Sequence, residues 1–441
     1  MKKVFLCLAC LIFSFTSAKA DEIDKLIKEF NLNKKSELSV YVKNLDTNKV
    51  LYKKHSNKPL NPASTLKVLS YGASLLVLGS DYEFQTELFE DGKDLYLKLS
   101  GDTKLTSKDL KKLLSNVKNK EYENIYIDNS IFADEKYPTS WLEEDKFPNQ
   151  RELSTYIIDN NMVKIGVKRS SLATNIEIIQ EDEYKIAIIN DLKNAQNNEQ
   201  KIKIERLHGE NAPILTFSGE ISKDEVINLP VLNPEINFMV KFQKALDDNK
   251  IVCLKKIVNK NVPQNALKIA EISRNITDFS NDILYRSDNF TSEIITKVAT
   301  AKYINYSHPA GFVDEINMLN DIFNISDEKI QIADASGVSR KNLITTEFYI
   351  NSIEMLFDKT LISNMLMGAN QGTMSGRGLF LKDNLKAKTG TLKNYSSIFA
   401  NLITKNNNNL VLISIEQDST LRKALLKNFE DMLIGLLYKK Y

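Results

Sequence analysis

Ser64 and Lys67 stand three positions apart in the stretch PASTLKVLSYGASLLVLG, which otherwise reads as an apolar helix. Residues at this spacing lie on one face of a helix, so the lysine amine can reach the serine hydroxyl. A serine at a helix N-terminus also lies near unsatisfied backbone N–H groups, which favour a developing oxyanion. The pKa of a lysine in water is about 10.4, but burial lowers it. The pattern therefore predicts a serine nucleophile with a lysine as its base.

The Ser-x-x-Lys spacing alone is a weak signal in this lysine-rich chain. It recurs at Ser115–Lys118 and Ser326–Lys329, where an ordinary helix surface would explain it. What singles out Ser64 is the order of two further motifs, Ser-Asp-Asn at 287–289 and Lys-Thr-Gly at 388–390. The ordered triple is the signature of penicillin-binding proteins and class A β-lactamases, and here it falls on a helix start, a loop and a strand.

Histidine and metal chemistry have little to work with in this sequence. His55, His208 and His308 stand in scattered polar stretches, where surface positions explain them. A Ser-His-Asp triad would depend on a chance approach of one of them in the fold. The chain has no Cys/His cluster at metal-ligand spacing, so we expect neither a metal site nor a cofactor.

The first twenty residues differ from the rest of the chain. Two lysines precede an apolar run from Val4 to Phe15, and small residues end the segment before Asp21. This pattern predicts a secretory signal peptide over residues 1–20, with a run too short to favour a membrane anchor. A lipoprotein site at Cys10 is the weaker alternative, because the residues before it suit lipidation poorly.

Without that segment the chain reads as a soluble, core-forming protein. The segment holds three of the 59 basic residues and none of the 57 acidic ones, so the net charge becomes about −1, which gives no reason to expect nucleic acid. Only Cys253 remains, so we expect no disulfide within the chain. No later segment is apolar for long enough to span a bilayer, and the amphipathic C-terminal stretch is expected to pack on its own domain.

The elements that must position the motifs form a strand-and-helix frame around a long middle. A hairpin is predicted over 38–52, and a helix from 62 that Gly79 ends. The middle, from 81 to about 262, reads as short strands with one clear helix near 107–117, and helical spacing returns from about 266. The last segments read as strands and a final helix, at 386–392, 396–403, 410–415 and 421–441. The pattern predicts an α/β (α+β) fold.

With these motifs in place, the sequence resembles the class C low-molecular-mass penicillin-binding proteins, which are D-alanyl-D-alanine carboxypeptidases and endopeptidases of the bacterial periplasm. The likeness covers nearly the whole mature chain. Beside the triple it includes LSGDTKLT at 99–106, IYIDNSIFADE at 125–135 and DASGVSRKNLIT at 334–345.

The resemblance also implies a domain organisation, with a serine β-lactamase-like catalytic domain whose sheet centres on KAKTGTL and packs against helices. Two strand-rich domains would be nested between the first and second motifs. The implied boundaries are 21–82 and 264–441 for the catalytic domain, 83–164 and 236–263 for the first insert, and 165–235 for the second.

The resemblance implies roles for the first two motifs. Ser64 would attack the carbonyl between two D-alanines and form an acyl-enzyme, with Lys67 as the candidate base. Ser287 would relay the proton to the leaving amine. Asn289 would hold Lys67 and the substrate amide.

The Lys-Thr-Gly strand would bind the charged end of the substrate. Lys388 would supply a positive charge for the terminal carboxylate, and Thr389 a hydroxyl donor beside it. Backbone N–H groups of Ser64 and Thr391 would form the oxyanion hole, and Gly390 would permit the close approach.

A pocket for the diaminopimelate side chain of the stem peptide is also implied. Arg340 matches the family arginine, and its guanidinium suits a carboxylate. For the ammonium we expect an acid of SWLEEDKF, and among Glu143, Glu144 and Asp145 we favour Asp145. The plain alternatives are a surface ion pair for Arg340 and a solvated loop for the three acids.

Three functions remain open from the sequence. The leading one is a peptidoglycan peptidase of the periplasm, with stem peptides as substrates and β-lactam antibiotics as covalent inhibitors. A β-lactamase is disfavoured by the long insert between the motifs and by the lack of an identifiable deacylating glutamate. A sensor that keeps the pocket but turns over little is the third. The oligomeric state has no sequence signal.

Overall fold

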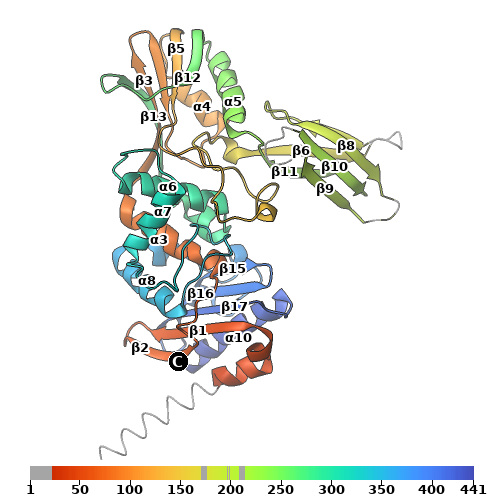
Figure 1. The fold of residues 1–441 in the computed structure, drawn as a ribbon, viewed down its shortest axis with the longest axis vertical. Coiled ribbons are helices and arrows are strands. Elements are labelled where there is room, and N and C mark those ends of the chain that lie inside the picture. Colours follow the sequence, from red (N-terminus) through yellow and green to blue (C-terminus); the bar gives the residue numbers. More distant parts are fainter. Residues whose placement is uncertain (1–21, 170–175, 196, 198, 208–213) are drawn as a thin grey trace, which may run out of the picture. The chain divides into compact units, whose positions relative to one another are not determined.

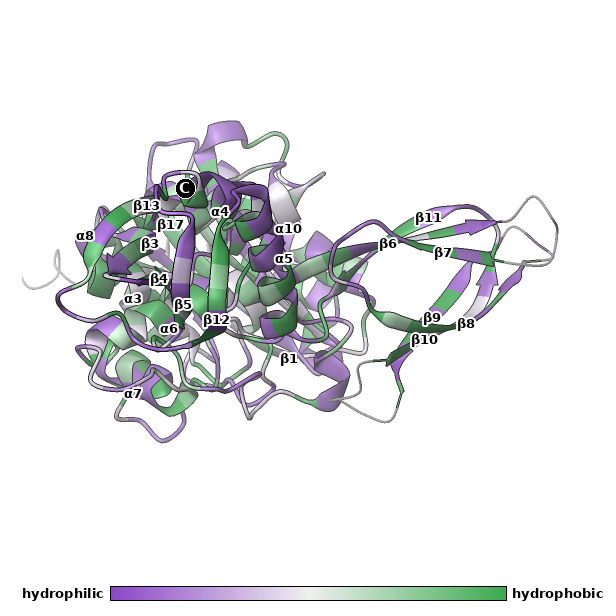
Figure 2. Cartoon of the chain, turned by 90° about the horizontal axis from the view of Figure 1, so that it is seen from above, coloured by the Kyte–Doolittle hydropathy of each residue, from purple (hydrophilic) through white to green (hydrophobic). Residues whose placement is uncertain are grey.

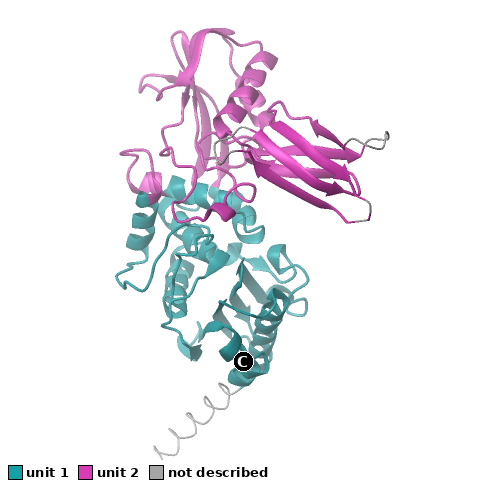
Figure 3. Cartoon of the chain, turned by 45° about the vertical axis from the view of Figure 1, so that its right-hand side comes forward, with its two compact units in different colours: residues 1–81, 276–299, 313–441 teal, residues 82–275, 300–312 magenta. Residues whose placement is uncertain are grey.

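The computed structural model describes residues 22–169, 176–195, 197, 199–207 and 214–441. The chain divides into two compact units (Figure 3): unit 1 comprises 1–81, 276–299 and 313–441, and unit 2 comprises 82–275 and 300–312. The expected signal peptide at 1–20, and His208, lie outside the described residues. Among the described helices, none has the length and apolar character needed to cross a membrane.

Unit 1 is built on a six-stranded antiparallel sheet in the order β14-β15-β16-β17-β1-β2 (Figure 1). The N-terminal hairpin, expected from its alternation, joins the C-terminal strands because β1 pairs with β17 along its whole length. The strand bounds are β1 Glu37–Asn44, β2 Lys49–Lys54, β14 Met367–Gly368, β15 Leu385–Leu392, β16 Tyr395–Ile403 and β17 Asn409–Gln417.

The strand that carries the Lys-Thr-Gly motif, β15, does not lie at the centre of this sheet, where we expected it. The central places belong to β16 and β17, whose residues are buried almost without interruption. The two-residue strand β14 pairs only with Lys386 and Ala387. The edge of β15 from Lys388 onward is therefore unpaired within the described chain.

Helices cover both faces of the sheet, and alternation along β16 decides which residue meets which helix. Ile398 and Ala400 belong to the core that α10 closes with Phe429. Phe399 points the other way and packs against Tyr349 of α8 at a ring distance of 5.5 Å. The helix bounds are α2 Leu32–Lys35, α3 Leu66–Leu78, α6 Asn289–Tyr303, α7 Phe312–Ile322, α8 Thr346–Lys359, α9 Ile362–Met365 and α10 Lys423–Lys440, and residues 22–29 are also helical.

Unit 2 contains a five-stranded sheet in the order β12-β5-β4-β3-β13, covered by α4 and α5. Apolar side chains of both helices, such as Leu110 and Phe238, share one core with Leu97 and Ile125 of the strands. The bounds are β3 Glu83–Asp91, β4 Asp94–Lys98, α4 Ser107–Leu114, β5 Glu121–Asp128, α5 Pro234–Asp248, β12 Val252–Asn259 and β13 Leu267–Asn275.

The same unit contains two small sheets, β11-β6-β7 and β8-β10-β9, with hydrophilic and hydrophobic residues alternating along their strands (Figure 2). They enclose a core of their own, which includes Ile165 and Phe217. This separate core supports the nested domain at 165–235, which we keep as a proposal. The bounds are β6 Met162–Arg169, β7 Ile176–Gln180, β8 Ala187–Asn194, β9 Lys201–Arg206, β10 Ile214–Ile221 and β11 Glu225–Pro230.

Two segments of unit 2 differ from the expectation. Helix α5 was not foreseen in the strand-rich middle, although Asn233 caps it and Pro234 opens it, which is a usual helix start. The segment 267–275 was expected to be helical and catalytic, but it forms β13, an edge strand paired with β3. Its apolar spacing of two and three suits either structure, and only the pairing decides. Unit 1 therefore resumes at 276, later than the expected 264.

Candidate active site

Ser64 lies in a strained turn, η1 (Ala63–Thr65), that leads directly into α3 of unit 1. Ala63 has a left-handed φ of 47°, which is unfavourable for a residue with a side chain. The turn is held because the Ala63 N–H donates to Asn61 Oδ1 at 2.8 Å and the Thr65 hydroxyl donates to the Pro62 carbonyl at 2.7 Å. The neighbours of Ser64 are buried, whereas Ser64 itself is half-exposed. The turn thus presents the serine hydroxyl at the N-terminal end of a helix.

Lys67 lies one helical turn further, and its side chain is fully buried. Its Nζ lies 3.0 Å from Ser64 Oγ, 2.7 Å from Asn289 Oδ1 and 2.5 Å from the Ser336 carbonyl. Burial lowers the pKa of Lys67 to about 8, although the carboxylates of Asp334 and its neighbours act in the opposite direction. A substantial fraction of Lys67 is therefore neutral near pH 8 and can accept a proton.

The second motif sits where a left-handed residue meets the start of α6. Ser287 has a φ of 60°. Asp288 Oδ2 accepts both the N–H and the hydroxyl of Thr291, at 2.9 and 2.6 Å, and so fixes the first turn of α6. With that turn fixed, the Ser287 hydroxyl points to Lys388 and the Asn289 amide to Lys67.

Lys388 of β15 is fully buried. It pairs with Phe399 and therefore lies on the face of the sheet that α8 covers. Its Nζ donates to Ser287 Oγ and to the Thr389 carbonyl, both at 2.8 Å. Burial, and then the charge of Lys67, keep the pKa of Lys388 well below its ordinary value. The five expected catalytic residues thus form two groups, each around a lysine amine. Ser64 and Asn289 contact Lys67, and Ser287 contacts Lys388.

Gly390 lies where β15 passes close to the backbone of Pro62 and Ser64. A Cβ on Gly390 would lie 2.7 Å from the Pro62 carbonyl oxygen and 2.9 Å from the Ser64 nitrogen, which is too close for any side chain. The neighbouring strand helps to hold this approach, because the Ser397 hydroxyl donates to the same Pro62 carbonyl at 2.5 Å. Backbone of β15, with Thr391 following, therefore runs close to the Ser64 N–H, as an oxyanion hole requires.

The structure adds residues that the sequence did not single out as site residues. Glu293 of α6, fully buried, accepts the Ser336 N–H at 2.8 Å. Gly337 has a φ of 79°, and a Cβ there would collide with the Ala63 carbonyl. The Thr373 and Thr389 hydroxyls lie 2.5 Å apart. The loop with Ser336 and Gly337 was visible in the DASG stretch, whereas Glu293 and Thr373 had no sequence signal of their own.

The two residues expected to read the substrate side chain are in different units. Arg340, half-buried in unit 1, donates from Nη1 to the Val338 carbonyl at 2.9 Å. Asp145, also half-buried, ends a short 3-10 helix of unit 2. Next to it, Glu143 is exposed and pairs with Lys146 at 2.6 Å. Their joint action stays a proposal.

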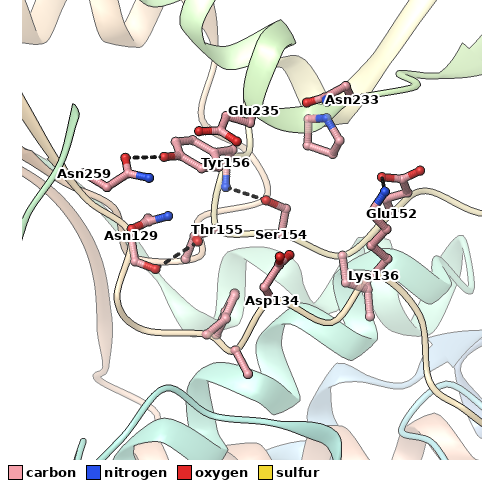
Figure 4. Close-up of a pocket in the computed structure, with 14 residues that line it drawn as sticks. Asn129, Asp134, Lys136, Glu152, Ser154, Thr155, Tyr156, Asn233, Glu235 and Asn259 are labelled. Carbon is pink, nitrogen blue, oxygen red and sulfur yellow. Dashed lines mark hydrogen bonds and ion pairs between the residues drawn. The ribbon is translucent and has the colours of Figure 1, made fainter. Parts of the chain in front are cut away.

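Unit 2 also has a polar cavity of about 340 Å³ (Figure 4). A serine and a lysine line it, but each has another partner. Ser154 Oγ accepts the Tyr156 N–H at 3.1 Å, and Lys136 pairs with Glu152 at 3.4 Å. This serine and lysine are therefore not arranged as a nucleophile and its base.

Comparison with known proteins agrees with this geometry. The model of the family described as D-Ala-D-Ala carboxypeptidase 3 (S13) matches residues 19–440. The D-alanyl-D-alanine carboxypeptidase DacB of Haemophilus influenzae is 22% identical over 92% of this chain and 91% of its own length. The crystal structure of penicillin binding protein 4 (dacB) from the same organism superposes with a TM-score of 0.83, covering 95% of this chain and 99% of that one at 22% identity. A second structure of that protein, complexed with a β-lactam, gives a TM-score of 0.77 at 21% identity, covering 95% of this chain and 99% of that one.

Proposed function

The chain belongs to the D-Ala-D-Ala carboxypeptidase 3 (S13) family, and we propose that it cleaves the D-Ala-D-Ala ends of peptidoglycan stem peptides through an acyl-enzyme on Ser64. The observation that carries the proposal is a buried lysine amine 3.0 Å from an accessible serine hydroxyl at a helix N-terminus. This pairing supports acylation of Ser64, and turnover then separates a peptidase from a sensor that keeps the pocket.

Acylation begins when neutral Lys67 takes the proton of Ser64 as Oγ attacks the carbonyl carbon between the two D-alanines. The carbonyl oxygen becomes an oxyanion. The N–H groups of Ser64 and Thr391 hold it, since Gly390 lets β15 approach this closely. The C–N bond then breaks, which leaves the acyl group on Ser64 Oγ.

The leaving D-alanine needs a proton on its amine. The Ser287 hydroxyl supplies it, and the Lys388 amine lies 2.8 Å behind as the group that replenishes the hydroxyl. Asn289 keeps Lys67 aligned and presents its amide N–H₂ to the substrate. Water then attacks the acyl carbonyl carbon and gives up a proton that replaces the one lost by Lys388. The bond to Ser64 Oγ breaks, and the proton held by Lys67 returns to Oγ, which completes the cycle.

The substrate's terminal carboxylate is recognised by Lys388 and Thr389. An arriving carboxylate favours the charged form of Lys388 and offsets its burial. The peptide itself can pair with the open edge of β15 in an extended conformation, because β14 pairs with β15 only at Lys386 and Ala387. We propose that the same site serves both carboxypeptidase and DD-endopeptidase cleavage of stem peptides.

Labelling with penicillin tests the nucleophile. We expect mass spectrometry to place the label on Ser64, and Ser64→Ala to lose labelling and D-alanine release by about 10⁴-fold or more. Ser115→Ala and Ser326→Ala are matched controls at the other Ser-x-x-Lys positions and should label like the wild type. A label that persists on Ser64→Ala would overturn the assignment.

Turnover separates the three candidate functions. We expect D-alanine release from a pentapeptide, with slow hydrolysis of a chromogenic cephalosporin. Rapid cephalosporin hydrolysis would instead indicate a β-lactamase, and acylation without turnover of either substrate a sensor.

Recognition of the diaminopimelate side chain is the finer part of the proposal. Arg340 would bind its carboxylate through paired donors and Asp145 its ammonium. Arg340→Ala should lower activity on diaminopimelate peptides by about 10- to 100-fold, the equivalent of a charge-assisted hydrogen bond. Penicillin acylation should change little, because penicillin lacks that side chain. Equal losses on both substrates would show that Arg340 supports the fold instead.

The proposed cellular location of the protein rests on its substrate and on its N-terminal segment. We propose export to the periplasm with removal of residues 1–20. Sequencing the N-terminus of the protein from a periplasmic extract should begin at Asp21, and an uncleaved chain in the membrane fraction would contradict this.

A further inference from the structure

Two carboxyl groups behind the active site have no role in the reaction just described. Glu293 lies on the first turns of α6, directly after the second motif, and Glu315 lies on α7. Both side chains have no exposed surface. Burying two acids is costly unless they are paired and hydrogen-bonded, so their place beside the base needs a physical explanation.

Glu293 binds the backbone of the loop at Ala335 and Ser336, and this loop in turn binds the Lys67 amine. Its carboxylate accepts the N–H of Ser336 at 2.8 Å and that of Ala335 at 3.4 Å. The carbonyl of Ser336 accepts from Lys67 Nζ at 2.5 Å, and that of Ala335 accepts from the Ser70 hydroxyl at 2.6 Å. One residue of the loop, Ser336, therefore links the Glu293 carboxylate, through its N–H, to the Lys67 amine, through its carbonyl.

Glu315 is unusual because neither of its oxygens meets a donor among the described groups. The group within hydrogen-bonding reach is the carboxyl of Glu293. Two adjacent carboxylates cannot both ionise at neutral pH, and a proton between them gives each a partner. Consistent with this, burial and then Asp334 raise the pKa of Glu293 to about 8, and burial and then Glu293 raise the pKa of Glu315 well above its ordinary value.

Other charged groups face the pair from each packed element. Lys297, one turn after Glu293 on α6, favours the charged form of Glu315. Asp334, from the loop, disfavours ionisation of both acids. Lys67, on α3, interacts with Glu293 but not measurably with Glu315: burial lowers its pKa, and Asp334 and then Glu293 raise it. The charge on the pair and the charge on Lys67 are therefore coupled.

We propose that Glu293 and Glu315 form a positioning pair that shares one proton, and that the charge of this pair, transmitted through the backbone of Ser336, sets how much of Lys67 is neutral and ready to activate Ser64. The inference rests on the proposed function, in which Lys67 is the base. When the negative charge is confined to Glu293, the Lys67 ammonium is stabilised. When it is removed, the neutral amine is favoured.

Two isosteric variants test the pair in opposite directions. In Glu315→Gln the amide donates a permanent hydrogen bond to Glu293, which becomes a fixed anion. In Glu293→Gln the charge beside the loop is gone, while the amide oxygen still accepts the Ser336 N–H. The measurement is the rate constant of penicillin acylation against pH. We expect its lower limb to move up by about 0.5 to 1 pH unit in Glu315→Gln and down by a similar amount in Glu293→Gln.

Glu416→Gln is the matched control, because Glu416 is equally buried on the other side of the sheet. It should leave the acylation profile where it is in the wild type. Opposite shifts in the two test variants support the proposal. Unchanged profiles, or shifts in the same direction, overturn it.

A readout independent of activity separates this proposal from the proposed function. Infrared difference spectra at neutral pH should show a buried protonated carboxyl band that weakens in both Glu293→Gln and Glu315→Gln. An unaltered band would overturn the shared proton even if the enzyme is active. Wild-type protein that never acylates would overturn the proposed function, while the spectra would still decide the proton.

Discussion

Unit 1 buries charged side chains in two places, around Lys67 beside the nucleophile and around Arg377 between the sheet and α10. In the first, which we call the site cluster, the cations are the amines of Lys67 and Lys388. In the second, the Arg377 cluster, the cation is a guanidinium with carboxylates of α10 around it. Both clusters also contain a pair of carboxyls with raised pKa values: Glu293 with Glu315, and Glu430 with Glu416.

The Arg377 cluster is a fixed brace. Nη2 donates to Glu430 Oε2 at 2.7 Å, and Nε to Asp431 Oδ1 at 2.9 Å. The other Glu430 oxygen accepts the Ser396 hydroxyl at 2.6 Å. A guanidinium does not lose its proton in a protein, so Arg377 keeps its charge at any working pH.

The site cluster differs because its cations can exchange protons. Burial favours the neutral form of both lysines, and each amine contacts a hydroxyl to which we assign a part in the proposed reaction. The comparison teaches that burial of charge stabilises a fold where the cation is permanent and ion-paired with carboxylates. Where the cation can be deprotonated, the same burial prepares a base.

The largest effect should come from removing the guanidinium. Arg377→Met leaves Glu430 and Asp431 without their cation, and we expect a loss of about 3–5 kcal/mol in the free energy of unfolding. Lys388→Met is the counterpart in the site cluster. It should abolish activity without lowering stability, since burial and Lys67 both disfavour the Lys388 ammonium. Urea unfolding measures both, and an equal loss in the two variants would break the distinction.

The pH dependence of acylation should come next in size. Only neutral Lys67 can take the Ser64 proton, and its pKa of about 8 leaves about 1% neutral at pH 6. The rate constant of penicillin acylation should therefore rise about tenfold per pH unit up to pH 8 and then level off. A flat profile between pH 6 and 8 would show that Lys67 is not the titrating base.

Glu416→Gln should change how stability depends on pH. Burial and then Glu430 raise the pKa of Glu416 well above its ordinary value. The folded chain thus holds a proton that the unfolded chain has lost above about pH 4.5, and wild-type stability falls as pH rises. Between pH 5 and pH 9 the free energy of unfolding of the variant should fall by about 1 kcal/mol less than that of the wild type. Urea unfolding at both pH values measures this. An identical pH dependence would exclude a shared proton in the brace.

The smallest effect should come from Thr373, which lies between the clusters in sequence. Thr373 stands four positions before Arg377. Its hydroxyl lies 2.5 Å from that of Thr389, which is expected to donate a hydrogen bond to the substrate carboxylate. Thr373→Val should lower kcat/KM for D-Ala-D-Ala peptides by about 3- to 10-fold, as expected for one hydrogen bond. Thr404→Val, at a hairpin turn, is the control. A comparable loss on a peptide with an amidated C-terminus would show that Thr373 does not act through the carboxylate.

The sequence determined the chemistry of this protein because the three motifs are local. The spacing of Ser64 and Lys67, the polar tip of the first hairpin and the glycine that ends α3 each depend on neighbours within one turn. The family model and the similar folds confirm the class of protein that these motifs predicted. The strands at the C-terminus were also found from their own alternation.

The tertiary structure alone decided where β15 lies in its sheet, that 267–275 is a strand and that buried acids stand behind both clusters. Glu293, Glu315 and Glu430 look like surface residues in the sequence, because charged side chains are almost never fully buried unless paired. Their burial depends on partners far along the chain, such as Ser336 for Glu293 and Arg377 for Glu430. Pairings of this kind are set by the packing of whole helices against a sheet, and no local pattern of residues encodes them.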